Sequence, residues 1–141
     1  MSGPLATTCG PLDFANPVLA ASGTFGYGDD FQRFFPLDAL GGFVTKTLFL
    51  EPRDGNPPPR IAETPCGMLN SIGLANIGWD RFAAERADEV NRLRGAARMI
   101  VNIAGNSPDE YHRIAARVEA DRERLRALVR LSRRPAEPTP G

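Results

Sequence analysis

The apolar residues of this chain fall into short continuous runs that are separated by segments of helical periodicity. Three runs are apolar enough to be strands buried on both faces, over residues 17–21, 42–47 and 99–104. Helices are predicted over 29–35, over 79–93 and from residue 108 onward. Strands that alternate with helices in this way predict a parallel sheet of the α/β class.

The ends of the predicted helices carry recognisable signals. Pro36 ends the first helix and Gly95 ends the second. The third opens on the run Ser107-Pro108-Asp109-Glu110, which is a capping box with proline at the first helical position. Ile114 and Val118 then share one face of that helix.

Two stretches do not fit the alternation. Residues 5–16 predict a β-hairpin that turns at Cys9-Gly10-Pro11. Residues 48–76 form a long irregular excursion, and its part 51–59 holds too much proline for regular structure, although 60–63 could be an edge strand. A loop of this length is usually functional or disordered, and the apolar residues within it favour a function.

Composition narrows the class of protein. Hydrophobic residues make up 42% and charged residues 24% of the 141 residues, which is typical of a soluble globular domain. The formal net charge is zero, so charge gives no reason to expect nucleic acid or an anionic membrane as partner. No run is long enough for a membrane span and the N-terminus lacks a signal-peptide pattern, so a cytoplasmic location is expected. Cys9 and Cys66 form neither a metal-binding spacing nor a disulfide framework, and no metal site is predicted.

Polar side chains stand at the end of each predicted strand. Ser22 and Gly23 follow the first, Thr47 and the sole lysine of the chain, Lys46, end the second, and Asn102 lies near the end of the third. Because the carboxyl ends of parallel strands share one edge of a sheet, these residues predict a single site. Asn102 taken alone could equally be a buried amide that a neighbouring loop satisfies.

An ammonium group, hydroxyls and a carboxamide suit an anionic ligand that carries a polar heterocycle. Neither a Walker motif nor a GxGxxG run is present, and no pair of carboxylates has acid–base spacing. Cys66 could act as a nucleophile, but no histidine lies near it in sequence, and His112 is expected on a helix surface. The residues alone therefore predict a ligand site without defining a reaction.

Four blocks of sequence, in order, resemble the dihydroorotate dehydrogenase family, the flavin enzymes of pyrimidine biosynthesis. The blocks comprise residues 16–18 with 21–26, residues 44–47 with 51–53 and 55–57, residues 60, 63–65 and 67–74, and residues 101–105. The resemblance covers about residues 5 to 118. The run Glu-Thr-Pro-Cys-Gly-Met-Leu-Asn at 63–70 is most similar to the soluble class 1B form.

This resemblance implies a (β/α)8 TIM barrel that oxidises (S)-dihydroorotate to orotate in the de novo synthesis of UMP. It implies contact with FMN by Ser22, Gly23, Lys46, Thr47 and Asn102, and it implies that the substrate is bound by Lys46 together with Asn70, Ser71, Ile72, Gly73 and Leu74. In the family a hydride passes to the flavin while a cysteine base removes a proton. Class 1B chains pair with a subunit that carries FAD and an iron–sulfur cluster and passes electrons to NAD, whereas class 1A enzymes use fumarate. A homo- or hetero-oligomer is expected.

The sequence departs from the family after the third helix. The family's fourth strand carries an Asn-x-Ser-Cys-Pro-Asn motif with the cysteine base, and this motif is absent, so no catalytic residue is assigned. We expect a partial flavin-binding barrel over 1–118, cut after about three β/α units, then a divergent basic helix over 119–134 and a disordered proline-rich tail over 135–141. A reading-frame slip or an early stop would explain the change, and a genuine charged helix that ends the chain is the alternative. A non-catalytic fragment or flavin-binding remnant is the alternative, and an exposed edge on the third strand would cause self-association.

Overall fold

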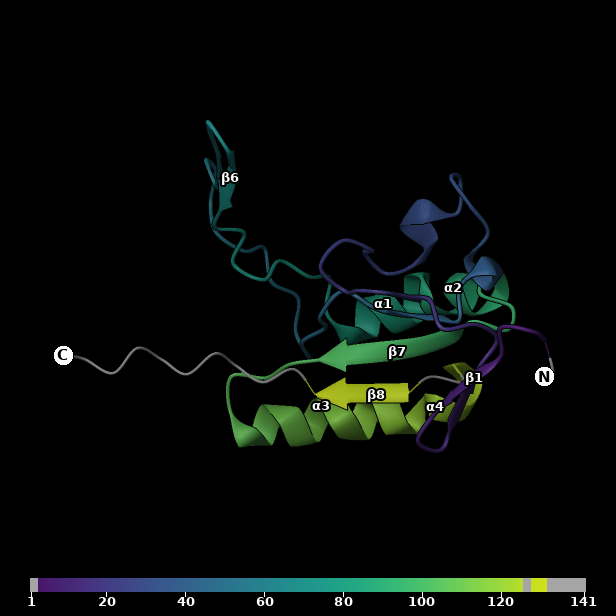
Figure 1. Ribbon diagram of the computed structural model, residues 1–141. Helices are drawn as coiled ribbons and strands as arrows, with labels where there is room; N and C mark the ends of the chain where they lie inside the picture. Colours follow the sequence, from purple (N-terminus) through teal and green to yellow (C-terminus); the bar gives the residue numbers. More distant parts are fainter. Residues whose placement is uncertain (1–2, 126–127, 132–141) are drawn as a thin grey trace.

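The computed structural model describes residues 3–125 and 128–131 (Figure 1). Its main sheet has four parallel strands, β3 (Leu19–Ala20), β4 (Gly42–Val44), β7 (Arg98–Ile103) and β8 (Leu128–Leu131), which are hydrogen-bonded in this order. Leu19 pairs with Gly42, Val44 with Ile100 and Ile103 with Leu131. The three expected strands are therefore confirmed as neighbours in one parallel sheet, and the α/β class is confirmed.

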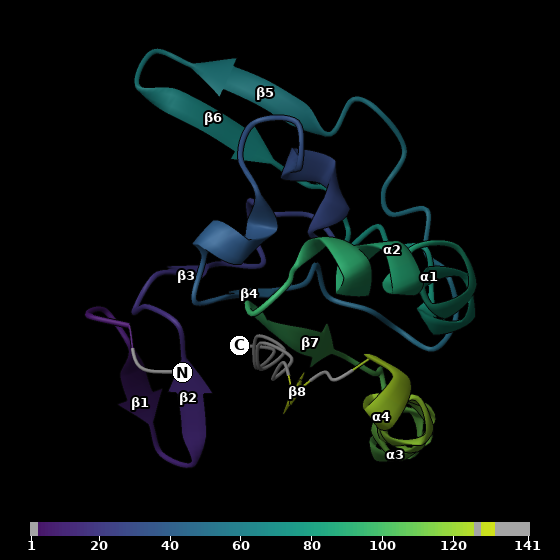
Figure 2. The same cartoon turned by 90° about the vertical axis from the view of Figure 1, so that its right-hand side faces the viewer.

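Two antiparallel hairpins stand apart from this sheet. The first pairs β1 (Thr7–Cys9) with β2 (Leu12–Phe14), which confirms the hairpin expected near the N-terminus. The second pairs β5 (Ile61–Thr64) with β6 (Gly67–Asn70), so the expected edge strand forms its own ribbon inside the excursion. Figure 2 shows the β5–β6 hairpin projecting away from the sheet.

Four α-helices within the described ranges cover one face of the sheet. They are α1 (Trp79–Glu85), α2 (Ala87–Leu93), α3 (Pro108–Ala120) and α4 (Arg122–Leu125), and all lie on the same side of β4 and β7 in Figure 2. Two 3-10 turns, η1 (Asp29–Phe31) and η2 (Leu37–Ala39), occupy the connection between β3 and β4. No described helix is long and apolar enough to cross a membrane.

The helix expected over 79–93 is broken at Arg86, whose backbone φ of −124° lies outside the helical range. The Arg86 side chain turns toward η1, where it donates to Asp29 at 2.9 Å and to Asp30 at 2.8 Å. The helix expected over 29–35 is likewise only the three-residue turn η1. Ser107 caps α3 as predicted, since its hydroxyl accepts from the Glu110 N–H at 3.2 Å.

The core lies between the helices and the sheet. Alternate residues of β7 point in opposite directions, and Met99, Val101 and Ile103 are fully buried toward the helical layer. They pack with the large buried residues of β4 and of helices α1 to α3, which include Phe43, Trp79, Phe82, Val90, Ile114 and Val118. Asn102 belongs to the opposite face of β7, which leaves it available to the site.

The basic helix expected over 119–134 is a wrong prediction for residues 128–131, which form a strand. After α3 the chain forms the short helix α4, and residues 128–131 pair as strand β8 with the last four residues of β7, from Ile100 to Ile103. The β7 edge is therefore paired, and not exposed, from Ile100 to Ile103. The tail expected over 135–141 lies outside the described residues.

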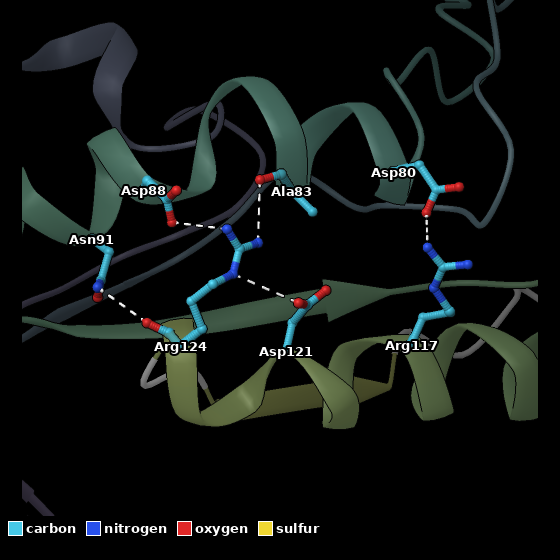
Figure 3. Close-up of polar contacts among 7 residues, drawn as sticks. All are labelled: Asp80, Ala83, Asp88, Asn91, Arg117, Asp121 and Arg124. Carbon is cyan, nitrogen blue, oxygen red and sulfur yellow. Dashed lines mark hydrogen bonds and ion pairs between the residues drawn. The ribbon is translucent and has the colours of Figure 1, made fainter.

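Side-chain contacts link α4 to the first helical pair (Figure 3). Arg124 donates to Asp88 at 3.0 Å and to the Ala83 carbonyl at 3.2 Å, and its own carbonyl accepts from the Asn91 side chain at 3.3 Å. About two helical turns earlier in the chain, in α3, Arg117 pairs with Asp80. These contacts hold α3 and α4 beside α1 and α2, on the side from which the chain enters β8.

Candidate functional site

An open cleft of about 230 Å³ lies beyond the carboxyl ends of the first two sheet strands. It is lined by Ser22 and Gly23 after β3, by Lys46 and Thr47 after β4, and by Ile72, Leu74 and Ala75 from the excursion. The structure thus brings together Ser22, Gly23, Lys46 and Thr47, as the positions of the strand ends predicted. The excursion adds an apolar wall to these polar groups.

The backbone at Lys46 leaves the sheet and turns toward the glycine-rich loop. The Thr45 N–H still donates to the Ile100 carbonyl of β7 at 3.0 Å, but the Lys46 N–H donates to the Gly26 carbonyl at 2.6 Å. Gly26 has a φ of +57°, and a Cβ there would stand 2.2 Å from an Asp30 carboxylate oxygen. Glycine is therefore needed where this loop meets the lysine.

Asn102 is 6% exposed and is bonded to both threonines at the end of β4. Its backbone N–H donates to the Thr45 hydroxyl at 3.2 Å, and its side-chain NH₂ donates to the Thr47 hydroxyl at 2.7 Å. Because the Thr47 oxygen accepts from Asn102, the Thr47 hydroxyl proton is left to donate elsewhere. Asn102 does not itself line the cleft but orients a residue that does.

The five residues expected to hold a substrate do not all reach the cleft. Ile72 and Leu74 line it, with Gly73 between them. Asn70 and Ser71 border a separate concavity beside the β5–β6 hairpin. Gly73 has a φ of +76°, and a Cβ there would stand 2.7 Å from the Asn56 nitrogen, so the loop packs closely on the segment before the hairpin.

Two residues that sequence reasoning did not single out support the cleft. Asn76, which is buried, bonds to both ends of the excursion. Tyr27 is also buried, and its hydroxyl accepts from the Ile77 N–H at 3.2 Å. Burial raises the pKa of the Tyr27 hydroxyl and outweighs the hydrogen bond and the Arg86 charge, which lower it. In the sequence, the signal for Tyr27 was its place beside the glycine-rich loop, and the signal for Asn76 was its place just before a helix.

A small ion-pair cluster holds the glycine loop in place. The Tyr27 N–H donates to the Asp30 carboxylate at 3.0 Å, and Arg86 pairs with the same carboxylate while lying 5.0 Å from the Tyr27 ring centre. Burial acts to raise the pKa of Asp30, but the hydrogen bonds from Arg86 and Tyr27 and the Arg86 charge act more strongly together, so this pKa lies below its ordinary value.

The remaining candidates lie away from the cleft. Cys9 and Cys66 are exposed in the two hairpins, and neither lines the cleft. His112 is exposed on α3, as expected. Among residues 3–125 and 128–131 no group of three His, Cys, Asp or Glu side chains could hold a metal ion. The cleft can therefore offer cationic and hydroxyl donors and an apolar wall, but its lining includes no cysteine, histidine or carboxylate.

Comparisons with known proteins agree on one family. A family model described as dihydroorotate dehydrogenase matches residues 4–129. The catalytic subunit of dihydroorotate dehydrogenase B (NAD(+)) from Thermodesulfovibrio yellowstonii is 51% identical over 111 residues, which are 79% of this chain and 36% of the relative. A protein from Solibacter usitatus with the provisional name dihydroorotate dehydrogenase A (fumarate) is 49% identical over 79% of this chain and 36% of its own length.

A solved structure gives the same result for the fold. DHODH from Eimeria tenella, in complex with ferulenol, matches with a TM-score of 0.62 and 25% identity, over 81% of this chain and 33% of that one. The chain therefore spans little more than a third of the length of the relatives it matches.

Proposed function

Because the chain belongs to the dihydroorotate dehydrogenase family, we propose that its cleft is part of a site that oxidises dihydroorotate to orotate with FMN. The observation that carries the proposal is the convergence of Ser22, Gly23, Lys46 and Thr47 at the carboxyl ends of two neighbouring strands, with Ile72 and Leu74 beside them. Flavin and substrate sites of parallel barrels occupy this edge.

The residues present fit a flavin. A Cβ at Gly23 would meet no atom within 4 Å, so a planar ring can approach the backbone there. Ser22 and Thr47 offer hydroxyl groups. Because Asn102 donates to the Thr47 oxygen, the Thr47 hydroxyl proton is free to donate to a ligand. Ser22, Gly23, Lys46, Thr47 and Asn102 are the residues that would hold FMN, and Asn102 would act in part through Thr47. When bound, the flavin supplies the two-electron acceptor for the oxidation.

On the substrate side, Lys46 would pair with the carboxylate of dihydroorotate, because an ammonium ion binds a carboxylate by a charge-assisted hydrogen bond. Ile72 and Leu74 would cover the apolar surface of the ring and exclude water. Asn70, Ser71 and Gly73 belong to the same proposed substrate loop, although Asn70 and Ser71 face the neighbouring concavity. A partner subunit that passes electrons to NAD is proposed from the names of the relatives, and fumarate is the alternative acceptor.

A second candidate function is flavin binding without dehydrogenation. The observation that favours it is the lining of the cleft, which includes no cysteine, histidine or carboxylate to remove a proton from carbon. On this alternative the chain binds FMN and orotate but does not turn dihydroorotate over.

Titration of the chain with FMN, followed by flavin fluorescence, tests the proposal. We expect saturation at one FMN per chain, and binding at least about tenfold weaker in Lys46→Ala, because a charge-assisted contact is lost. Arg92→Ala is the control, since it removes an exposed cation on α2 that pairs with Glu89 on its own helix. Absence of FMN binding, or equal weakening by both variants, would refute the proposal. Oxidation of dihydroorotate by the loaded chain then separates the dehydrogenase from the flavin-binding alternative.

A further inference from the structure

Asn76 joins the beginning and the end of the excursion through its side chain. The side-chain oxygen accepts from the Phe49 N–H at 3.3 Å and from the Gly78 N–H at 3.0 Å. The side-chain NH₂ donates to the Leu74 carbonyl at 3.1 Å. The backbone of Asn76 is also paired in both directions with Arg53, at 2.8 and 2.9 Å. One buried residue thus ties the cleft wall to the point where the chain leaves the sheet.

The residue held by this amide has an unfavourable backbone conformation. Leu74 has a φ of +57° and is the only non-glycine residue with a positive φ among those that the structure describes. Leucine rarely adopts this region, because its Cβ then crowds the following carbonyl. Its side chain is 56% exposed at the cleft, so burial of the side chain does not account for the conformation. Such a conformation persists only where the surroundings hold it.

On the other side of the wall, the hydrogen bonds come from Asn56, which is exposed, whereas Asn76 is buried. The Asn56 N–H donates to the Ile72 carbonyl at 3.0 Å, and the Asn56 side chain donates to the carbonyl and hydroxyl of Ser71. Asn56 is exposed and fixes the wall to the base of the projecting hairpin. Asn76 connects the wall to Phe49, in the segment that follows β4 and carries Lys46, and it does so from a buried position.

We propose that Asn76 is a positioning residue that holds Leu74 in the apolar wall of the cleft which Lys46 also lines. The inference rests on the proposed function in one respect, namely that this cleft is the substrate site. The side chain at position 76 must accept hydrogen bonds from the Phe49 and Gly78 N–H groups and must also donate one to the Leu74 carbonyl. Asparagine supplies both, whereas aspartate lacks the donor and serine has one polar atom.

Asn76→Asp tests the donor alone. The substituted side chain keeps an oxygen for Phe49 and Gly78 but faces the Leu74 carbonyl with a carboxylate at pH 7.5. By hydrogen exchange we expect peptides that cover 70–78 to exchange at least about tenfold faster, and those that cover β7 to change less than about twofold. Unchanged exchange at 70–78 would overturn the proposal. An equal rise in β7 would also overturn it, because Asn76 would then support the whole fold.

Asn91→Asp is the matched control. Asn91 also donates its side-chain NH₂ to a backbone carbonyl, that of Arg124 at 3.3 Å, but between the helices and away from the cleft. The Asn91→Asp variant should show the same hydrogen-exchange rates at 70–78 as the unsubstituted chain. Faster exchange at 70–78 in this control, equal to that in Asn76→Asp, would contradict a local role for Asn76.

A pH change gives a second measurement that does not depend on how well Asn76→Asp folds at neutral pH. Burial raises the pKa of a carboxyl above its ordinary value of about 3.9, so lowering the pH from about 7.5 to about 4.5 should protonate the introduced group. The protonated carboxyl regains a donor for the Leu74 carbonyl and should restore slow exchange at 70–78 relative to the unsubstituted chain at the same pH. Asn76→Ala has no such group and should show no recovery. Equal behaviour of the two variants at both pH values would overturn the proposal.

Titration with orotate separates this inference from the proposed function. If the unsubstituted chain binds orotate, Asn76→Asp should weaken binding at pH 7.5 by about tenfold or more, and Asn91→Asp by less than about twofold. Equal affinities would overturn the role in the site. If the unsubstituted chain does not bind orotate, the proposed function fails, while the exchange measurements still decide whether Asn76 positions the wall.

Discussion

The helix-covered sheet and the excursion between β4 and α1 both contribute to the cleft, but they are held in place differently. On the sheet, Phe43, Met99, Val101 and Ile103 are fully buried against the helices. In the excursion, all eight residues of the β5–β6 hairpin are exposed, including Leu69 at 67%. Leu48 and Phe49, at the start of the excursion, are buried, whereas the cleft wall further along it is fixed by hydrogen bonds from Asn56 and Asn76.

This difference separates global from local effects of substitution. Apolar burial stabilises the fold as a whole, so a loss in the sheet core lowers the free energy of unfolding of the entire described domain. A few polar contacts order a segment without adding much to that free energy, so their loss frees the segment alone. The polar half of the cleft should therefore survive changes that release its apolar wall.

The largest effect is expected in the core. Phe82 is fully buried and packs against Trp79 and Tyr27, with ring centres 5.7 and 5.6 Å away. Phe82→Ala should lower the free energy of unfolding by about 3 to 5 kcal/mol, because it removes apolar contacts and leaves a cavity. Urea unfolding followed by circular dichroism measures this. Met68→Ala, in the exposed hairpin, should change it by less than about 0.5 kcal/mol. Comparable losses of unfolding free energy in Phe82→Ala and Met68→Ala would contradict the distinction between the sheet core and the excursion.

The next largest loss of stability is expected from removing a buried cation, Arg94, at the C-terminal end of α2. Arg94 is 5% exposed and donates to the Ala97 carbonyl at 2.6 Å, to the Leu125 carbonyl at 3.4 Å and to Asn91 at 2.9 Å. Arg94→Ala should cost about 2 to 3 kcal/mol in urea unfolding, since it leaves buried carbonyls without their donor. Arg113→Ala removes an exposed arginine whose ion pair is 4.0 Å long, and it should have almost no effect.

Much of the sheet could be predicted because its strands are short apolar runs bounded by turn residues. The position of Ser22, Gly23, Lys46 and Thr47 at one edge followed from the direction of parallel strands. Residues 128–131 could not be recognised in this way. Leu128 and Val129 suit one side of a helix as well as a strand, and it is pairing with β7 that determines the structure.

The other missed features depend on contacts between residues far apart in the sequence. The helix break at Arg86 accompanies ion pairs with Asp29 and Asp30, more than fifty positions earlier. Asn76 bonds to Phe49, which lies 27 positions before it. Local propensity and periodicity carry no information on such pairs. For Ile72 and Leu74, the resemblance to a family was the only signal, and the cleft lining includes both.

A smaller effect should appear in acid, at the cluster that connects the two regions. The pKa of Asp30 is lower in the folded chain than its ordinary value of 3.8. Its contribution to stability is therefore complete above pH 3.8 and is lost as the pH falls through the folded pKa. Unfolding experiments between about pH 5 and about pH 2.5 should show this loss, and Asp30→Asn should reduce the slope with pH. The carboxylate is 42% exposed, so solvent limits the size of the effect. An unchanged slope in the variant would assign the acid sensitivity to other carboxylates.

The smallest effect is expected from the surface ion pair between Asp80 and Arg117, which links α1 to α3 (Figure 3). The side chains are 68% and 54% exposed, so water and salt screen their attraction. A double-mutant cycle with Asp80→Ala and Arg117→Ala should give a coupling energy of about 0.2 to 1 kcal/mol, which falls further at about 1 M salt. Hydrogen exchange at 70–78 should be unaffected by either change. A salt-resistant coupling above this range would mean that charges, and not the apolar layer beneath them, hold α3 against α1. The helical side of the molecule would then depend on polar contacts as much as the excursion does.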